Sequence, residues 1–333
     1  MKKYMAYGVG AALVDTEIKV QDSDLAQMNV EKGLMTLVDQ DRRAELLAHL
    51  EGHLVKASHA SGGSAGNSMI AAAQFGAPTF MSCKVSDDAD GDIYLADLEA
   101  AGVDHNLTGE RATGITGKCL VLITPDAERS MNTYLGISET LSTEQLDAQA
   151  IASSEYLYIE GYLVTSPTGR AAAIKAREIA EAAGVKTSLS FSDPGMVEFF
   201  RDGMAEIIGA RVNLVFCNEA EAMGWAQSDN REVAIEKLKQ IADNFVITLG
   251  SAGALTYDGV SLTEIPPHKV QAVDSNGAGD MFAGAFLYAI TRGEDFPTAG
   301  RFASLAAGKI VANYGPRLAA ADYPALRAEF FGD

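Results

Sequence analysis

The sequence is poor in cysteine and in basic residues, and each shortage excludes a class of protein. The three cysteines, Cys83, Cys119 and Cys217, are widely spaced and form no CxxC pair, which disfavours disulfides and zinc and indicates a reducing, cytoplasmic setting. Lys and Arg total 26 against 45 Asp and Glu, and the net charge of −19 argues against nucleic acid or anionic lipid as a partner. An anionic ligand must then be met by backbone N–H groups, a few cations or a divalent metal.

Long apolar runs and several familiar motifs are also missing. No run is long enough for a membrane span, and the apolar stretch 6–14 ends at Asp15 without a cleavage site, so it is predicted to be a buried strand and not a signal peptide. There is no GxxxxGK[ST] and no HRD or DFG set, and the five histidines show no metal spacing. Gly8–Leu13 nearly matches the dinucleotide fingerprint, but Leu13 replaces the third glycine, which leaves a nucleotide-dependent dehydrogenase as the weaker alternative.

What the sequence does contain is an alternation of short apolar strands and amphipathic helices, typical of a parallel sheet covered on both faces. Strands are predicted at Tyr4–Val9, Thr79–Ser82, Tyr156–Glu160, Thr187–Ser190, Leu214–Cys217 and Phe245–Leu249. Helices are predicted at Asn67–Phe75, Asp88–Ala101, Pro167–Ala183, Asn218–Met223, Arg231–Ile241, Asp280–Thr291 and Phe296–Asn313.

Two segments interrupt this alternation. Residues 15–38 carry alternating strand patterns, and residues 114–135 have the pattern of a hairpin that turns at Pro125–Glu128. We expect them to form a small β-sheet that projects from a single domain, residues 1–333, and acts as a lid. Open strand edges on such a lid leave a homodimer as an open alternative.

The stretch Asp274–Asp280 is a glycine-rich turn that leads directly into an apolar helix. Such a turn points several backbone N–H groups at one place, where the helix dipole also favours negative charge, so the place suits a phosphate. A carboxylate there adds negative charge beside an anion. Asp280 is therefore predicted to accept a proton from a hydroxyl that attacks the phosphate, with a simple helix cap as the alternative.

A second glycine cluster, Ser61–Ser68, also precedes an apolar helix. Its glycines allow the backbone to approach a ligand closely, and Asn67 can donate or accept a hydrogen bond; a flexible turn with an Asn cap is the alternative. Asp15, near the end of the first strand, could accept hydrogen bonds from two vicinal hydroxyls of a sugar or could cap a turn.

Two further motifs follow predicted strands. Thr248–Gly253 ends a strand, where ligands collect in open α/β sheets, although a tight turn explains it equally. Asn218 and Glu221 share one helix face and could organise water around Mg²⁺, or they could cap a helix with a solvated acidic face.

These four motifs occur in the order seen in the ribokinase-like (PfkB) carbohydrate and nucleoside kinases, which the chain resembles from Gly8 to Arg317. Ser61–Asn67, Thr124–Gly136 and Glu160–Leu163 are most similar to bacterial adenosine kinases and the sugar kinases grouped with them. The resemblance implies a three-layer α/β/α fold with a mostly parallel central sheet and a small β-sheet lid.

The resemblance also implies a role for each motif. Asp280 would be the general base, beside an anion hole made by the N–H groups of Asn276, Gly277, Ala278 and Gly279. The acceptor would be held by Asp15, Gly62, Gly63, Asn67 and Tyr134, and the ATP-binding residues would be Asn218, Thr248, Gly250, Ser251, Gly253 and Asn276. Glu221 would support Mg²⁺ through water, and Arg129 on the lid would neutralise phosphate charge. A monovalent cation near Asp274 is known in relatives, and nothing in the sequence specifies it here.

The function implied is ATP-dependent phosphorylation of the 5′-hydroxyl of a ribonucleoside. Adenosine is favoured as the acceptor, and a free sugar such as ribose or fructose is the alternative within the same chemistry. Stacking on a purine requires aromatic or long apolar side chains near the lid, and Tyr134, Met131 and Tyr162 are available for it.

Overall fold

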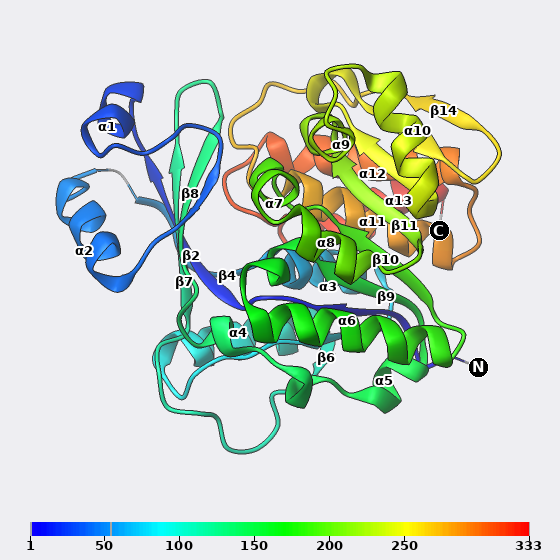
Figure 1. Cartoon of the computed structure of the whole chain (residues 1–333). Coiled ribbons are helices and arrows are strands. Elements are labelled where there is room, and N and C mark those ends of the chain that lie inside the picture. Colours follow the sequence, from blue (N-terminus) through cyan, green and yellow to red (C-terminus); the bar gives the residue numbers. More distant parts are fainter. Residues whose placement is uncertain (1, 54, 333) are drawn as a thin grey trace.

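The computed structural model describes residues 2–53 and 55–332, with residues 55–60 described through their backbone alone. A large sheet lies between two layers of helices, and a smaller sheet stands beside it (Figure 1). Among the described helices, none combines the length and apolarity that crossing a lipid bilayer requires.

The large sheet has nine strands in the order β14-β13-β12-β11-β10-β9-β1-β5-β6. They are β1 (Tyr4–Val9), β5 (Thr79–Ser82), β6 (Val103–His105), β9 (Ser154–Glu160), β10 (Lys186–Ser190), β11 (Val212–Asn218), β12 (Ala242–Thr248), β13 (Ala254–Tyr257) and β14 (Leu262–Ile265). The seven strands from β6 to β12 in this order pair in parallel, and β13 and β14 add an antiparallel edge. Because parallel strands end at one edge, the loops after β1, β9, β11 and β12 gather there.

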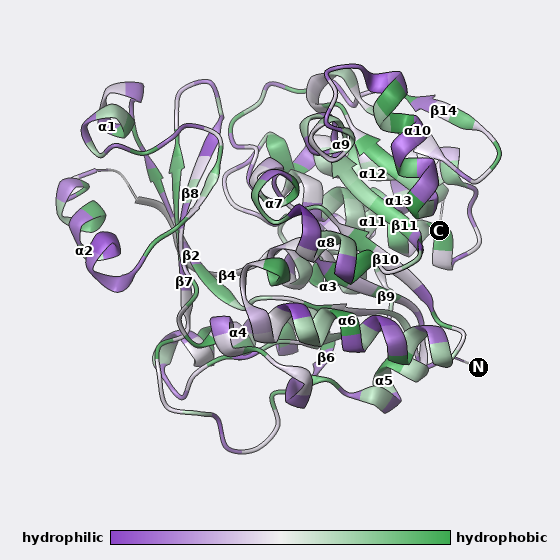
Figure 2. Cartoon of the chain, viewed as in Figure 1, coloured by the Kyte–Doolittle hydropathy of each residue, from purple (hydrophilic) through white to green (hydrophobic). Residues whose placement is uncertain are grey.

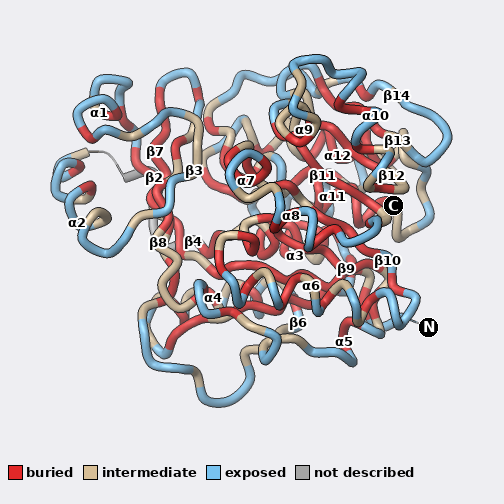
Figure 3. Tube along the Cα trace, in the orientation of Figure 1, coloured by how far each residue is buried: buried red, intermediate tan, exposed pale blue. Residues whose placement is uncertain are grey.

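Helices cover both faces of the large sheet, and each face has its own hydrophobic cluster. One face carries α3 (Ser64–Phe75), α4 (Ala89–Ala101), α11 (Ala278–Thr291), α12 (Phe296–Val311) and α13 (Asp322–Phe331). The other carries α5 (Ala148–Ala152), α6 (Pro167–Ala182), α7 (Pro194–Phe199), α8 (Arg201–Ile208), α9 (Glu219–Ala226) and α10 (Arg231–Ile241). Hydrophobic residues follow the strands in Figure 2, and the same strands are buried in Figure 3, as expected for a sheet with no solvent-facing side.

The small sheet has five strands in the order β3-β8-β7-β2-β4. They are β2 (Leu13–Lys19), β3 (Met35–Leu37), β4 (Val55–Gly62), β7 (Gly117–Ile123) and β8 (Arg129–Tyr134). Strand alternation gives the sheet two different faces. Ile18, Leu120 and Leu122 pack with α1 (Asp22–Gln27) and α2 (Gln40–His49) on the outer face, and Cys119, Val121 and Ile123 cluster on the opposite face.

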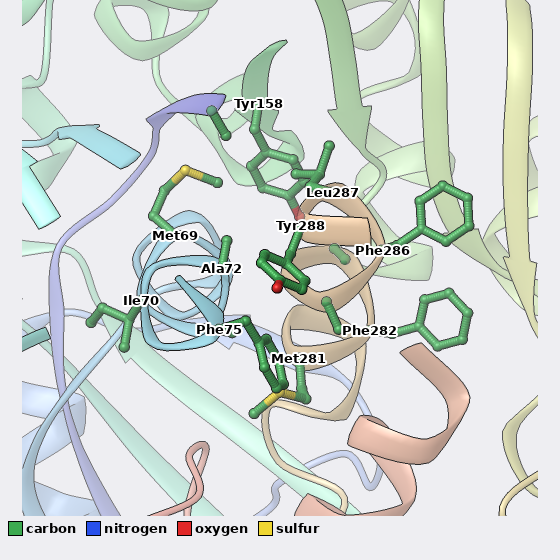
Figure 4. Packing of buried hydrophobic residues seen from close by; sticks show 14 of the residues in the cluster. Met69, Ile70, Ala72, Phe75, Tyr158, Met281, Phe282, Phe286, Leu287 and Tyr288 are labelled. Carbon is green, nitrogen blue, oxygen red and sulfur yellow. The ribbon is translucent and has the colours of Figure 1, made fainter. Parts of the chain in front are cut away.

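Helices α3 and α11 pack side by side in one cluster of buried apolar residues (Figure 4). Phe75 on α3 contacts Tyr288 on α11, with ring centroids 5.7 Å apart. At Gly284 a Cβ atom would lie 2.5 Å from the Ser68 carbonyl oxygen and 2.8 Å from the Ala71 Cβ. The two helices can therefore approach this closely only because position 284 has no side chain.

The predicted fold class is confirmed, and all six strands and seven helices predicted for the main body are present, with ends shifted by three residues or fewer. The predicted segments 15–38 and 114–135 supply four strands of the small sheet. The fifth, β4, was missed, because its sequence has few of the β-branched and aromatic residues that mark a strand. The very short strands β6, β13 and β14 and the helices α1, α2, α5, α7, α8 and α13 were also not predicted.

Replacing Gly284 by alanine tests the close contact between α3 and α11. Helix propensity alone favours Gly→Ala by up to about 1 kcal/mol, whereas overpacking costs about 1–3 kcal/mol. We expect Gly284→Ala to lower the free energy of unfolding measured in urea, since the added Cβ meets backbone and not a flexible side chain.

The control for this substitution is Gly279→Ala in the same helix, where a Cβ would meet nothing within 4 Å. This variant should unfold at the same or higher urea concentration than the wild type. A Gly284→Ala protein as stable as the control would contradict the close contact.

Candidate active site

A cavity of about 620 Å³ lies at the carboxyl-end edge of the large sheet, against the small sheet. Its volume is in the range of small-molecule sites. Residues from all four sequence motifs line it, together with side chains of the small sheet: Asp15, Gly63, Asn67, Cys119, Arg129, Met131, Asn218, Glu221, Thr248, Gly250, Gly277, Gly279 and Asp280 are among them. The fold therefore brings together segments that are up to 265 positions apart, since Asp15 and Asp280 share one cavity.

Asp280 occupies the first turn of α11 and opens on the cavity. Its Oδ1 accepts a hydrogen bond from the Ser64 hydroxyl at 2.7 Å, and its Oδ2 accepts one from the Asn67 side-chain amide at 3.0 Å. Burial raises the pKa of the Asp280 carboxyl, while these two hydrogen bonds and the positive charge of Arg129 act in the opposite direction. A carboxylate held from both sides at the mouth of a helix fits the role of a general base.

The turn before Asp280 adopts a conformation that requires glycine. Gly277 has a φ of +71°, and a Cβ there would lie 2.7 Å from the Pro316 Cα. Within the described chain, no protein acceptor receives the N–H group of Gly277 or Gly279, so both are available to an anion.

The structure leaves fewer N–H groups available to an anion than the four predicted from the sequence. The N–H group of Asn276 already donates to Asp274 Oδ1 at 2.9 Å, and that of Ala278 donates to the Ser275 carbonyl at 3.3 Å. The donors that remain are the glycine N–H groups on either side of Ala278. Local pairing inside the turn is the physical reason for the difference, and the sequence does not reveal such pairing.

Asp15 is only 6% exposed, and its Oδ1 has no hydrogen-bond partner among the described residues. It lies on β2 opposite Cys119 of β7. Burial is the main reason that the pKa of the Asp15 carboxyl is raised to about 7, with the charge of Arg317 acting against this shift and the charge of Asp280 adding to it. A Cβ at Gly62 would lie 2.1 Å from Asp15 Oδ1, so glycine at 62 makes room for the carboxyl and does not line the cavity itself.

Arg317 orients Asn67 and was not identified as a site residue from the sequence. Its guanidinium donates to Asn67 Oδ1 at 3.1 Å and to the Ser61 hydroxyl at 2.6 Å, and it forms an ion pair with Asp97 at 3.2 Å. Because the oxygen of the Asn67 amide is held by Arg317, its NH₂ group faces Asp280. Arg317 and Asn67 are 250 positions apart in sequence, and only the tertiary structure brings them into contact.

Glu160 is a second cavity-lining acid that sequence reasoning did not assign to the site. It ends β9, accepts hydrogen bonds from the N–H groups of Ala11 at 3.2 Å and Ala65 at 2.8 Å, and is 1% exposed. Burial raises its pKa to about 7. Its position at the carboxyl end of a parallel strand was the available signal. The carboxyl ties the loop after β1 to the start of α3.

Asn218 and Glu221 form a reciprocal capping box at the start of α9. Asn218 Oδ1 accepts from the Glu221 N–H at 2.8 Å, and the Glu221 carboxylate accepts from the Asn218 N–H at 2.9 Å and from its side-chain amide at 2.8 Å. Both residues also line the cavity, and burial raises the pKa of Glu221 to about 7. Asn218 and Glu221 therefore cap the helix and also face the cavity, so capping does not exclude contact with a ligand.

The donor set near Glu221 suits a metal held through water and not directly. No group of three or more His, Cys, Asp or Glu side chains able to hold a metal occurs in residues 2–53 and 55–332, as far as their side chains are described. Glu221 and Asp193 are two buried carboxyls that line the cavity, and the charge of Asp193 adds to the burial that raises the pKa of Glu221. A hydrated divalent cation would relieve this repulsion.

Only part of the predicted nucleotide turn, Thr248–Gly253, lines the cavity. Thr248, Leu249 and Gly250 line the cavity, whereas Ser251 and Gly253 do not. Gly253 has a φ of +98°, and a Cβ there would lie 2.1 Å from the Ile265 carbonyl oxygen. This glycine therefore shapes the turn that presents its neighbours.

Strand alternation divides the β8 residues in the same way. Arg129, Met131 and Thr133 line the cavity, and Tyr134 does not, because neighbouring side chains of a strand point to opposite faces. No ion pair involves Arg129 among the described residues, so its charge faces a cavity lined with acids. Tyr162, after β9, lines the cavity as an aromatic side chain.

Comparison with known proteins identifies relatives of this arrangement. The model for the pfkB family carbohydrate kinase matches residues 32–322. The structure of a probable sugar kinase from Rhizobium etli has a TM-score of 0.93 at 31% identity and covers 100% of this chain and 99% of that one. The structure of adenosine kinase from Sinorhizobium meliloti has a TM-score of 0.92 at 32% identity over 98% and 99% of the two chains. Adenosine kinase of Schizophyllum commune is 26% identical over 89% of this chain and 91% of that protein.

Replacing Asp15 by asparagine tests the burial of its carboxyl. A native pKa of about 7, above the unfolded value near 3.8, stabilises the fold at pH below about 4 and this contribution is lost as the pH rises to 7. The stability of Asp15→Asn relative to wild type should therefore rise by ~1–4 kcal/mol between pH 4 and pH 7 and then level off. Urea unfolding at a series of pH values measures this difference.

Asp229→Asn makes the same chemical change at an exposed position and is the matched control. Its stability relative to wild type should vary little over the same pH range. An Asp15→Asn profile as flat as the control would show that the Asp15 carboxyl is not held in an unfavourable environment.

Proposed function

The chain belongs to the pfkB family of carbohydrate kinases, and from this premise we propose that it phosphorylates the 5′-hydroxyl of a ribonucleoside, with adenosine as the preferred acceptor. Transfer of a phosphoryl group from ATP to an alcohol is the reaction of the family. The proposal concerns the acceptor and the role of each residue.

In the proposed reaction, the phosphoryl group is transferred at the start of α11. Asp280 takes the proton of the attacking hydroxyl, with Ser64 and Asn67 holding the carboxylate in place. The N–H groups of Gly277 and Gly279 stabilise the charge on the transferring phosphoryl group, which is the main demand that such a transfer makes on a protein. Arg129 adds a positive charge from the small sheet.

ATP is expected to lie along the ends of β11 and β12. Asn218, Thr248 and Gly250 line that part of the cavity, and the ends of parallel strands are where nucleotides bind in open α/β sheets. Mg²⁺, which kinases of this family use with ATP, would be held through water by Glu221 and would neutralise charge on the phosphates.

The observation that carries the nucleoside proposal is that the cavity lining offers both a carboxyl group for hydroxyls and apolar side chains for a flat base. Asp15, with a free carboxyl oxygen, suits the vicinal hydroxyls of a ribose. The same cavity is also lined by Met35, Met131, Leu135 and Tyr162. Thioether and aromatic side chains make favourable contacts with a flat purine, and a free sugar would leave them uncovered.

A sugar kinase is the second candidate, because the similarity to the probable sugar kinase from Rhizobium etli covers the whole chain. The chemistry at Asp280 would be unchanged. In this case the carboxyl groups of Asp15 and Glu160 would be the main contacts of the acceptor, since both line the cavity.

An acceptor panel of adenosine, ribose and fructose, assayed by ADP release, tests the proposal. Covering about 100 Å² of apolar surface by a base contributes ~2.5 kcal/mol, or ~70-fold in binding. We therefore expect kcat/KM for adenosine to exceed that for ribose by ~50-fold or more. Turnover of a sugar without turnover of adenosine would reverse the order of the two candidates.

Replacing Asp280 by asparagine tests the general base. The amide cannot accept the proton, so kcat should fall ~10²–10⁴-fold, whereas the rise in melting temperature on adding the acceptor should persist. Steady-state kinetics and thermal shift measure the two effects, with Asp229→Asn as a control of the same chemistry at an exposed site. Near-native turnover in Asp280→Asn would rule out the proposed mechanism.

A further inference from the structure

Glu17 is a fully buried carboxyl group to which no part of the mechanism above assigns a task. It lies on β2, two residues beyond Asp15 and therefore on the same face of the small sheet. Its side chain is 0% exposed, and its Oε2 has no hydrogen-bond partner among the described residues. Burying such a group is costly, and an apolar residue would fill the same space at lower cost. Packing alone therefore does not explain a carboxyl group at position 17.

Among the described residues, the side chain of Glu17 accepts one hydrogen bond, and it comes from the phosphate cradle, the turn of residues 274–279. Asn276 Nδ2 donates to Glu17 Oε1 at 2.8 Å, and Asn276 is the residue directly before Gly277. The two partners are 259 positions apart in sequence, one on the small sheet and the other in the turn that opens α11. Asn276 is itself 6% exposed, so its amide has little water to replace Glu17.

Asn276 is held through its backbone and through its side chain, and Glu17, with Asp15 beside it on β2, holds the side chain from outside the turn. Its backbone N–H donates to Asp274 Oδ1 at 2.9 Å, and Asp274 Oδ2 accepts from the Gly315 N–H at 3.0 Å. These bonds fix the backbone of Asn276, whereas the bond to Glu17 fixes its side chain. Together they determine the direction of the peptide that leads to the N–H group of Gly277.

We propose that Glu17 is a positioning residue for phosphoryl transfer, which acts by holding Asn276 so that the glycine N–H groups of the cradle point at the transferring phosphoryl group. The carboxyl does not touch the substrate, because it is fully buried behind Asn276. The inference depends on kinase chemistry at Asp280 and holds for either acceptor, a nucleoside or a sugar.

The role requires an acceptor oxygen at this position and does not require a negative charge. Burial raises the pKa of Glu17 to about 7, so glutamine is a close substitute for the carboxyl in shape and in hydrogen bonding. Methionine has a similar volume and no comparable acceptor. The pair of variants Glu17→Gln and Glu17→Met therefore separates the hydrogen bond from the filling of space.

The test measures kcat and KM of both variants with ATP and the best acceptor of the panel. Because anion-hole donors act mainly in the transition state, Glu17→Met should lower kcat ~10–100-fold and leave both KM values within ~threefold of wild type. Glu17→Gln should keep kcat within ~threefold. Glu31→Gln, an exposed acid outside the cavity lining, is the control that should match wild type.

A double-mutant cycle shows whether the effect passes through Asn276. Asn276→Ala should lower kcat by a similar factor, and the double variant Glu17→Met/Asn276→Ala should fall no more than ~threefold further. Melting temperatures of all variants identify any loss of fold, and Glu17→Gln keeps the test open if Glu17→Met does not fold.

Several results would overturn the proposal. They are an unchanged kcat in Glu17→Met, a higher KM with kcat unchanged, a Glu17→Gln variant as slow as Glu17→Met, and effects of Glu17 and Asn276 that multiply in the double variant. The wild-type acceptor panel is independent of these variants, so failure of this proposal and failure of the nucleoside assignment can be told apart.

Discussion

The close, parallel packing of α3 against α11 is the contact on which the site depends. The two helices touch where Gly284 lies against Ser68 and Ala71, and their first turns meet at Asp280. Each helix begins in a glycine turn, so two helix dipoles converge on one end of the cavity, where the N–H groups of Gly277 and Gly279 have no acceptor among the described residues. The positive potential needed for phosphate thus comes from backbone, in a protein with a net charge of −19.

The cavity is lined with acids, and burial determines how they behave. Asp15, Glu160 and Glu221 each have a pKa raised to about 7 by loss of water, so near neutral pH a large share of these groups carries a proton. Protonation lowers the negative charge that a polyanionic nucleotide would meet. Burial raises the pKa of Asp280 as well, and the hydrogen bonds from Ser64 and Asn67 act in the opposite direction. Burial therefore raises the pKa of all four carboxyls, and the hydrogen bonds that Glu160, Glu221 and Asp280 accept oppose this shift.

The parts of the site that the sequence predicts are those whose function is local. A glycine turn, the helix that follows it and Asp280 are adjacent in the chain, so their pattern by itself indicates a phosphate cradle. Arg317 and Glu160 were missed because each acts on a residue about 95 to 250 positions away, through hydrogen bonds that no local pattern encodes. The strand β4 was missed for a related reason, since its membership in the small sheet comes from pairing with β2. Tyr134 was expected at the acceptor, but the alternation of β8 turns it away from the cavity.

The two sheets divide the work of the site between them. The large sheet and its helices supply the proposed general base, the glycine N–H groups and the proposed nucleotide turn, which would serve phosphoryl transfer whatever the acceptor is. The small sheet supplies Met131, Cys119 and Asp15, which line the same cavity. Strand β2 contributes to both proposed tasks, because Asp15 is proposed to bind the acceptor while Glu17, two residues further on the same face, accepts the hydrogen bond of Asn276. A change in the small sheet that admits another acceptor can therefore also alter the transfer step, so acceptor choice and turnover are physically coupled in this chain.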